Sequence, residues 1–351
     1  MSINLHSKYL KEIEKHYTLD SVLNGWLAKD YSFAGVKTVR VVTPVTVPMT
    51  DYTRNGANRY GTPNEMEDIV QELTLSQDKS FTLTIDKGNN ADQNGIKDAG
   101  KMLALQIAEK AIPLMDKYSF ARLSQLAGKI VGNSTAITKS NVCERITAGT
   151  TYMDDCEVPT YDRVLFVPAD VYAKLRLSEE FKSCENLMDK SLRKGQVGTY
   201  DNMHVVKVPR SRWPENVNFM IVHKRAACAP IKLNDSKYHK DPPGISGSLV
   251  EGRMYYDLFV LGAKCDGVYV EVNTASGAGT ICEAPEISAS GTITCATGGV
   301  TIKYTTDGSD PRYSVSAKIG TEADITEEGT VVKAYACKNG TFPSEVTTVT
   351  L

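Results

Sequence analysis

Residues 51–90, DYTRNGANRYGTPNEMEDIVQELTLSQDKSFTLTIDKGNN, decide the fold that we expect for this chain. Within and just before them, residues 49–68 are rich in turn formers and charges and contain little that could build a hydrophobic core. Residues 69–86 alternate apolar and polar side chains, which predicts a strand. Residues 36–48 (VKTVRVVTPVTVP) are rich in β-branched residues and predict the strand before it. Together these segments predict a long two-stranded hairpin with a broad polar tip.

An isolated two-stranded hairpin is at best marginally stable in water. This hairpin therefore makes physical sense if it lies on another part of the protein or on another subunit. We expect its contacts to be made by charged and aromatic side chains near the tip and on the second strand. These residues are Arg54, Arg59, Tyr60, Asp78 and Lys79.

A long amphipathic helix is predicted after the hairpin, from about residue 92 to residue 124. Apolar side chains recur there every three or four residues and form one stripe. Pro113 lies inside this pattern and is expected to kink the helix or to end its regular part. Before the hairpin, residues 1–34 are mixed and polar, and the spacing of Tyr9, Leu10, Ile13 and Tyr17 predicts a short helix.

The rest of the chain divides into two regions of different composition. Residues 126–272 show an α+β pattern, whose strands are predicted at 162–168, 203–209, 218–223, 255–261 and 267–272. Residues 273–283 are small and read as a flexible linker. Residues 284–351 alternate Thr- and Val-rich strands with Gly turns, which predicts a small all-β sandwich.

Composition describes an ordinary globular protein of two or three domains, with 351 residues, 41% of them hydrophobic and 23% charged. Forty basic against 42 acidic residues give a net charge of −2, without the basic excess of a dedicated polyanion binder. Contact with nucleic acid through a locally basic face stays open. No apolar run approaches the ~20 residues of a membrane helix, and the first residues do not form a signal-peptide pattern. The eight cysteines form no CxxC pair, so reduced thiols are expected.

Short chemical motifs are present but incomplete. Asn90–Gly95 resembles the start of a calcium loop, but its twelfth position is Lys101, so capping of a helix is the better interpretation. Ser191–Lys194 matches SxxK without its companion motifs. Asp154, Asp155 and Glu157 have no His nearby in sequence and are interpreted as a solvated loop. We therefore expect no catalytic residue, no metal, no cofactor and no enzymatic activity.

Three long stretches carry a resemblance to a known family. They are residues 51–90, residues 162–175 (DRVLFVPADVYAKL) and residues 238–261 (YHKDPPGISGSLVEGRMYYDLFVL). In these stretches the chain resembles the major capsid (coat) proteins of tailed bacteriophages with the Hong Kong 97 fold. The resemblance covers roughly residues 30–272.

The resemblance implies a function for each predicted segment. Residues 1–35 would be the N-arm, 36–90 the extended loop (E-loop) that lies across a neighbouring subunit, and 91–125 the spine helix of the peripheral domain. Residues 126–272 would form the axial domain, with chain near 226–250 returning to the peripheral sheet. Glu251 and Arg253 would form a charged pair, either at a subunit boundary or within one subunit.

A second resemblance covers residues 284–351, which are similar to the immunoglobulin-like module at the C-terminus of chitobiase-type enzymes. The matching residues are IKYTTDGSDPRYS (302–314) and VVKAYACKNGTFPSEV (331–346). Asp307, Asp310 and Arg312 are expected on a surface loop of this module. Its stretch TTDGSDP (305–311) is better explained by turn chemistry than by a sugar site. The resemblance implies an outward-facing decoration, with contact to host-surface or mucus glycans as a hypothesis.

These resemblances imply a structural protein of the virion, made in the host cytoplasm. Many copies would assemble as pentamers and hexamers into an icosahedral head around double-stranded DNA, which they would contact non-specifically. A separate scaffolding protein and a portal protein are the other expected partners. Two alternatives stay open: a bacterial surface protein that binds carbohydrate, and a carbohydrate-active enzyme, for which no catalytic pair of carboxylates can be nominated.

Overall fold

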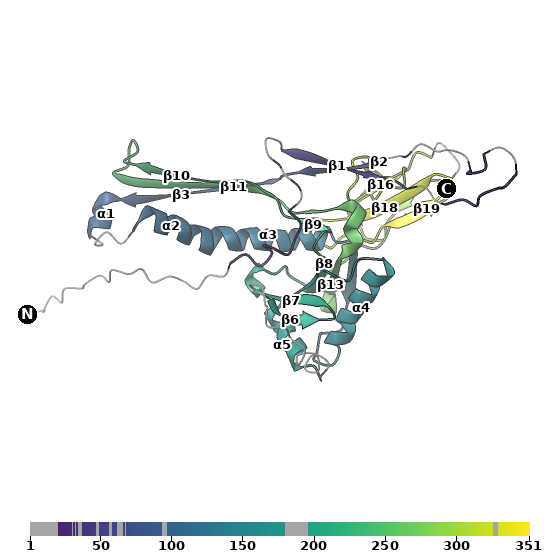
Figure 1. Ribbon diagram of the computed structural model, residues 1–351, viewed down its shortest axis with the longest axis horizontal. Helices are drawn as coiled ribbons and strands as arrows, with labels where there is room; N and C mark the ends of the chain where they lie inside the picture. Colours follow the sequence, from purple (N-terminus) through teal and green to yellow (C-terminus); the bar gives the residue numbers. More distant parts are fainter. Residues whose placement is uncertain are drawn as a thin grey trace, which may run out of the picture.

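The computed structural model describes residues 20–29, 31, 33, 37–46, 49–55, 58–61, 66, 68–92, 97–179, 196–325 and 329–351. Over this part the chain has a mixed α+β fold with a long arm, a central body and a C-terminal module (Figure 1). The arm consists of residues 77–92, 99–125 and 231–256. The helix predicted from Tyr9 to Tyr17 and the SxxK motif at Ser191–Lys194 lie outside the described residues.

The predicted hairpin is present but shorter than expected. Strand β1 (Thr38–Pro44) pairs antiparallel with β2 (Asp68–Thr74), so that Thr38 lies opposite Thr74. The prediction that the second strand continues to residue 86 is wrong. Pairing ends where Leu75 enters the core and the Ser76 N–H donates to the buried Asp257 carboxylate at 2.8 Å.

Strand β3 (Gln77–Asp86) instead joins a three-stranded antiparallel sheet, in the order β10-β11-β3. Its partners come from the second half of the chain and are β10 (Ile231–Lys240) and β11 (Gly247–Tyr256). Phe81 pairs with Gly252, where a Cβ atom would lie 2.3 Å from the Phe81 ring, so the absence of a side chain makes room for the aromatic ring. Residues 231–240 thus join this sheet, and its assignment as the peripheral sheet stays a prediction.

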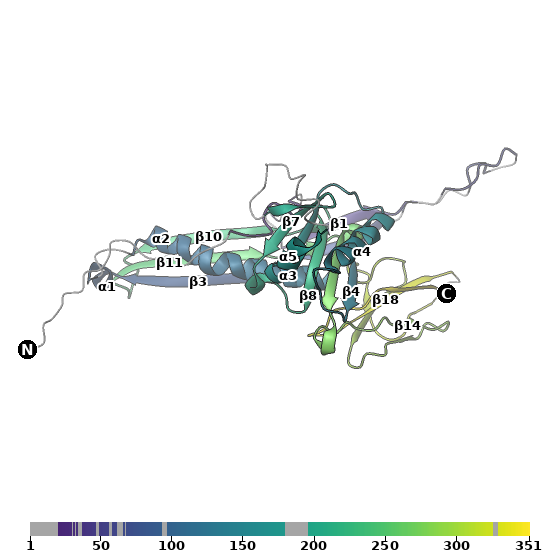
Figure 2. The same cartoon turned by 90° about the horizontal axis from the view of Figure 1, so that it is seen from below.

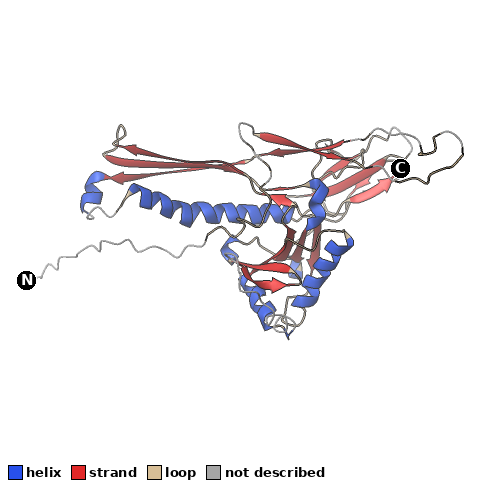
Figure 3. Cartoon of the chain, in the orientation of Figure 1, coloured by secondary structure: helices blue, strands red, loops and turns tan. Residues whose placement is uncertain are grey.

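One long helical segment runs along the three-stranded sheet (Figures 1 and 3). It consists of α2 (Ala99–Gln106), a π-helical turn η1 (Ile107–Ala111) and α3 (Ile112–Gln125). The predicted interruption at Pro113 is confirmed, because proline has no N–H and excludes the regular hydrogen bond to residue 109. The Ile112 N–H reaches Ile107 O, five residues back.

The helix begins later than the predicted residue 92. A separate short helix, α1 (Lys87–Asp92), follows β3, and the Asn90 side chain then bonds both backbone groups of Lys97. Asp98 is the N-cap of α2, and its carboxylate accepts the Lys101 N–H at 3.1 Å. The expectation of local capping in this region is met, at a position after the incomplete calcium motif.

The central body is a six-stranded mixed sheet in the order β4-β13-β8-β5-β7-β6. Its strands are β4 (Lys129–Asn133), β5 (Arg163–Pro168), β6 (Gln196–Tyr200), β7 (Met203–Val208), β8 (Val217–His223) and β13 (Val268–Asn273). Helices α4 (Val142–Asp155) and α5 (Ala169–Leu177) pack on it. Every residue of β5 is buried, as its continuous apolar run predicts.

Short elements connect these parts. They are η2 (Arg210–Arg212), β9 (Ala227–Cys228), β12 (Phe259–Val260), η3 (Gly262–Gly267) and η4 (Ala275–Gly277). The strand predicted at 255–261 is thus two strands, because β11 ends at Tyr256 and the chain turns at the buried Asp257. Asp257 accepts hydrogen bonds from the Tyr118 hydroxyl and from the backbone N–H groups of Ser76 and Leu258.

The C-terminal module has two small antiparallel sheets, as predicted for residues 284–351. One pairs β14 (Glu286–Ile287) with β15 (Ile293–Thr294), and the other has the order β17-β16-β18-β19. The strands of the second sheet are β16 (Thr301–Thr305), β17 (Lys318–Ile319), β18 (Val331–Cys337) and β19 (Thr347–Thr350). Figure 2 shows the module at the end of the molecule opposite the arm.

Candidate assembly surfaces and the docked module

The hairpin tip presents apolar and aromatic side chains to solvent. Met49 is fully exposed and Tyr60 is 88% exposed, and the exposed group also includes Val42, Val45, Tyr52 and Met66. The rings of Tyr52 and Tyr60 meet edge to face at 5.0 Å. Such an apolar group at the end of a two-stranded ribbon has nothing to cover it within the described part of this subunit.

The structure places three of the predicted contact residues at this tip. Arg54, Arg59 and Tyr60 are all exposed there. The tip has some internal order, because the Thr53 N–H donates to Arg59 O at 3.1 Å and the Gly61 N–H donates to Asn58 O at 2.9 Å. Backbone hydrogen bonds therefore fix the conformation of the described tip residues relative to one another.

The base of the hairpin is fixed to the body. Leu73 and Leu75 are buried in a cluster with Phe33, Cys228, Phe259 and Leu261. The Gln71 side-chain amide donates to Val260 O at 2.8 Å, and its carbonyl oxygen accepts the Gly262 N–H at 2.9 Å. The hairpin is thus anchored at one end and uncovered at the other.

The other two predicted hairpin residues, Asp78 and Lys79, lie on β3 in the three-stranded sheet, because β3 pairs with β11 and not with β1. Asp78 makes a bidentate ion pair with Arg253, at 2.9 Å and 2.5 Å. Glu251 lies 3.3 Å from His239 Nε2. The predicted Glu251–Arg253 pair is therefore wrong within the subunit, since each residue has a different partner across the sheet. A function of these residues at a subunit boundary stays a prediction.

The Asp78–Arg253 pair gives a testable titration. The hydrogen bond and charge of Arg253 hold the pKa of the Asp78 carboxyl below its ordinary value of 3.8. The favourable interaction is present at neutral pH and is lost as the pH falls through that lowered pKa. In Arg253→Gln we expect the pKa of Asp78 to return toward its ordinary value, as measured by carbon-detected NMR. An unchanged Asp78 titration in Arg253→Gln would contradict the pairing.

The first part of the long helical segment leaves its surface uncovered within the described part of the subunit. Neither α2 nor η1 contains a buried residue. The arm and the hairpin therefore leave large faces that a neighbouring molecule could cover.

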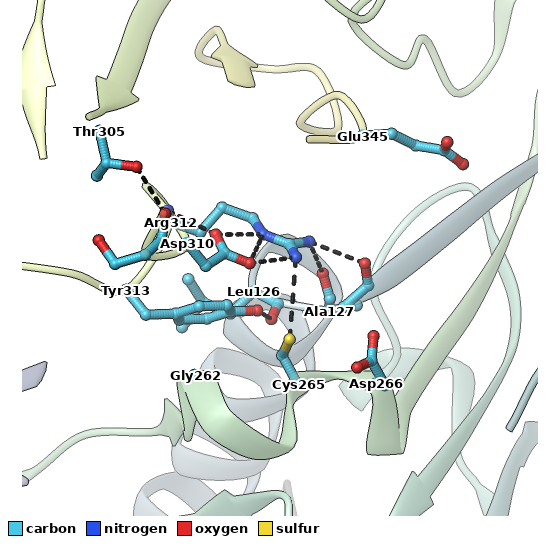
Figure 4. Close-up of polar contacts among 12 residues, drawn as sticks. Leu126, Ala127, Gly262, Cys265, Asp266, Thr305, Asp310, Arg312, Tyr313 and Glu345 are labelled. Carbon is cyan, nitrogen blue, oxygen red and sulfur yellow. Dashed lines mark hydrogen bonds and ion pairs between the residues drawn. The ribbon is translucent and has the colours of Figure 1, made fainter. Parts of the chain in front are cut away.

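The C-terminal module is docked on the body through Arg312. This guanidinium binds both carboxylate oxygens of Asp310 and donates to Ala127 O at 3.0 Å and to Gly128 O at 2.8 Å (Figure 4). These two carbonyl groups come just after the end of α3. A cation there is favourable because the C-terminal end of a helix carries a partial negative charge.

Tyr313 completes the same contact from inside. Its side chain is 8% exposed, belongs to the main hydrophobic core of the body and donates its hydroxyl to Leu126 O at 2.6 Å (Figure 4). Burial raises the pKa of the Tyr313 hydroxyl well above its usual value, so the group stays a donor. The neighbouring Cys265 has its pKa raised by burial to about 12 and is a thiol at neutral pH.

Further contacts tie the module to the hairpin and to the sheet. The Val315 N–H donates to Val70 O at 3.3 Å, and Ser314 forms an isolated β-bridge with Gln71. Val70 and Gln71 both lie on β2. Lys129 of β4 forms an ion pair with Glu345 of the module. We call this whole contact, from Leu126–Gly128 to Arg312–Val315, the module seam.

Two expectations about the module are corrected. Asp310 and Arg312 do not lie on a free surface loop, because their side chains are 22% and 10% exposed in the seam. Asp307 is exposed and closes a turn by accepting hydrogen bonds from Ser309 and Ser316. Residues 273–283 are not a free linker either, since the Asn216 amide donates to Ala278 O and Cys282 is buried.

The described residues contain no group of His, Cys, Asp and Glu side chains that could hold a metal ion. No helix within the described ranges is long and apolar enough to span a membrane. No disulfide joins the seven cysteines of the described chain. Asp154, one of the three carboxylates considered from the sequence, instead accepts a hydrogen bond from Arg163 at 2.7 Å.

Comparison with known proteins gives one kind of match for the C-terminal module and another for most of the chain. The family model described as Fn3 associated matches residues 292–351. No curated protein matches the sequence. The chain is similar to solved structures from Mycobacterium phage Che8, with a TM-score of 0.62 at 16% identity, covering 79% of this chain and all of that one.

Two further similar structures are those of a phage capsid and a phage head. The capsid structure of the cyanophage P-SCSP1u gives a TM-score of 0.61 at 13% identity and covers 78% of this chain and 94% of that one. The head structure of Helicobacter pylori bacteriophage KHP40 gives 0.54 at 12% identity, with coverages of 77% and 95%. The chain therefore has the fold of phage capsid chains, and its residues 292–351 match the Fn3-associated family model.

The seam residues are those that the sequence did not reveal as functional. The turn chemistry of TTDGSDP (305–311) explains Asp310, and nothing in the sequence marked Arg312 and Tyr313 as docking residues, although both side chains combine an apolar body with a polar tip. The structure supplies the reason, because the module's own core is small and Tyr313 packs in the core of the body instead. The module's own core has six buried residues, namely Ile293, Ile302, Tyr304, Ala323, Val332 and Ala334.

Proposed function

We propose that this protein is the major capsid protein of a tailed double-stranded DNA bacteriophage, with the Hong Kong 97 fold. The observation that carries this proposal is the hairpin β1–β2, anchored at its base and exposing apolar side chains at its tip. On a body with the fold of phage capsid chains, such a hairpin is suited to lie on a neighbouring copy. Its function is structural, and no enzymatic activity is proposed.

Repetition of one weak contact explains how a shell could close. Each copy would offer a hairpin and receive one, and symmetry would multiply the contact over pentamers and hexamers. The exposed apolar side chains of the hairpin tip and the uncovered surfaces of α2 and η1 support this proposal. The near-neutral net charge of −2 suits a wall protein that encloses DNA without binding it tightly.

The proposed partners follow from this function. They are other copies of the chain, a separate scaffolding protein, a portal protein and the packaged double-stranded DNA. The protein would be made and assembled in the host cytoplasm and would end in the virion shell. Residues 1–35 would act as the N-arm, and the long helix 99–125 as the spine helix.

The module is proposed as part of the shell wall and not as a loosely tethered decoration. The seam supports this, because it joins the module to the spine helix, the hairpin and the six-stranded sheet. Contact with host-surface or mucus glycans stays a prediction. It would have to use residues other than Asp310 and Arg312, which are occupied in the seam.

Assembly is tested by removing the two exposed tip aromatics. The double variant Tyr52→Ser, Tyr60→Ser is expected to fold normally and to reduce the yield of shells by about tenfold or more, because aromatic anchors dominate interface energies. Shells are counted by electron microscopy and sedimentation, and folding by circular dichroism.

A matched control removes exposed apolar side chains elsewhere. Tyr161→Ser with Ile319→Ser changes residues that are 59% and 70% exposed, and it is expected to leave the shell yield within about twofold of the unaltered protein. Shells that form equally well with both double variants would contradict the function assigned to the tip. A protein that never forms shells, with or without scaffold, would contradict the capsid proposal itself.

A further inference from the structure

A basic cavity lies where residues 20–29 meet the turn between β8 and β9. Its volume is about 510 Å³, and four of its eight lining residues are cations, namely Lys29, Lys224, Arg225 and Lys264. Asp162 is the one carboxylate in the lining. None of these four cations forms an ion pair with another residue of the described chain.

Backbone contacts hold the segments that carry these cations. The Lys224 N–H donates to Asp162 O at 3.0 Å, and the Ala28 N–H donates to Ala227 O at 3.0 Å. The Lys264 N–H in turn donates to Leu261 O at 2.9 Å. The four charges therefore come from three chain segments whose spacing is fixed by the fold, so their mutual repulsion is built into the folded subunit.

A buried histidine, His223, lies behind the turn that carries Lys224 and Arg225. His223 is 5% exposed, and its Nδ1 accepts the Arg225 N–H at 3.3 Å. Burial is the main reason that the pKa of His223 lies below its usual value; Arg163, Arg225 and Lys264 add to this, and Asp162 opposes it. The neutral ring then carries its proton on Nε2.

That Nε2 atom is buried without a hydrogen-bond partner in the described structure. His223 lines a second, smaller cavity of about 250 Å³, which shares Arg225 and Lys264 with the first. Glu157 and Asp266 also line the smaller cavity, so the excess of positive charge is in the larger one. Because His223 does not line the larger cavity, the case for an anion there rests on its four cations, which have one carboxylate, Asp162, among them and no ion pair within the described chain.

We propose that this basic cavity binds a phosphate group, and that the ligand is a backbone phosphate of nucleic acid. Arg225 offers the planar fork that fits two phosphate oxygens, and the lysines add point charges. This inference rests on the proposed function, in which the shell encloses DNA. Within an otherwise near-neutral protein, it assigns the contact with DNA to one place.

The test uses the full-length, unassembled subunit and a short fluorescent DNA duplex. Lys224→Gln, Arg225→Gln, Lys264→Gln is expected to weaken duplex binding at least tenfold in fluorescence anisotropy. It is also expected to lower the slope of log affinity against log salt by about 0.9 for each lost phosphate contact. Lys110→Gln, Lys117→Gln, Lys139→Gln removes three exposed charges elsewhere and is expected to stay within twofold.

Two additional ligands identify the source of the phosphate. Inorganic phosphate, titrated by calorimetry at constant ionic strength, is expected to bind much more weakly than the duplex; tight phosphate binding with no duplex binding would overturn the nucleic-acid assignment. Polyglutamate that binds as well as the duplex would overturn the phosphate assignment. Equal duplex binding by the two triple variants would overturn the cavity as the site.

Shell formation separates this inference from the capsid proposal. The cavity triple variant is expected to form shells, which electron microscopy would show. Shells without duplex binding in the unaltered protein would reject the cavity and leave the capsid proposal standing. Duplex binding that is lost in the cavity variant, in a protein that forms no shells, would support the cavity and reject the capsid proposal.

Discussion

Tyr313→Ala is expected to lower the free energy of unfolding of the subunit by about 3–5 kcal/mol, the usual cost of truncating a buried aromatic side chain. The Tyr313 ring is part of the main core of the body, although it belongs to the module. Its loss would leave a cavity in the module seam and remove the hydrogen bond to Leu126 O. Urea unfolding of the unassembled subunit, followed by circular dichroism, gives the measurement.

Two control variants divide this effect into its parts. Tyr313→Phe keeps the ring and is expected to cost about 1–2 kcal/mol, because only the hydroxyl hydrogen bond is lost. Tyr161→Ala removes an exposed ring and is expected to change stability by less than about 0.5 kcal/mol. If Tyr313→Ala costs no more than Tyr161→Ala, the module is tethered to the body and not docked on it.

Arg145→Met is expected to lower the free energy of unfolding by about 3–5 kcal/mol, because it leaves a buried carboxylate without its cation. Arg145 on α4 and Glu271 on β13 form a bidentate pair whose side chains are 8% and 3% exposed. Arg145 also donates to Thr135 O, and Asn218 donates to Glu271. The pair thus fixes α4 against β13 of the six-stranded sheet.

A variant that replaces both charges tests whether the lost stability comes from the unpaired Glu271 carboxylate. Arg145→Met with Glu271→Leu is expected to recover most of the lost stability, since no buried charge remains. Arg40→Met breaks the exposed pair between Arg40 and Glu72 and is expected to cost less than about 1 kcal/mol. An Arg145→Met variant as stable as Arg40→Met would show that Glu271 finds water in the folded protein. Urea unfolding again supplies the measurement.

Local pattern predicted the elements well where one segment determines its own conformation. The buried run of β5, the amphipathic stripe of α2–α3 and the interruption at Pro113 are all local properties of the chain. The resemblance to capsid proteins likewise rested on long stretches, and the structural similarity to phage capsid chains supports it at the level of the fold. The Hong Kong 97 assignment itself stays part of the proposed function.

Pairing partners were harder to predict because alternation in a strand does not identify its neighbour. Residues 69–86 read as one strand, yet β2 pairs with β1, and β3 pairs with a strand about 170 residues later. The same limit hid the ion pair from Asp78 to Arg253. In the module, burial of Arg312 depends on carbonyl groups after α3, which no pattern within residues 284–351 contains.

The module seam has a consequence for how the protein is made. Tyr313 and Phe342 fill part of the core of the body, and Phe342 exchanges backbone hydrogen bonds with Thr280 and Cys282. A nascent chain on the ribosome can form its spine and sheet early, but that interior stays open until Tyr313 and Phe342 have emerged. A polypeptide cut short by premature termination would lack this closing piece, so unfinished translation products would be poor building material.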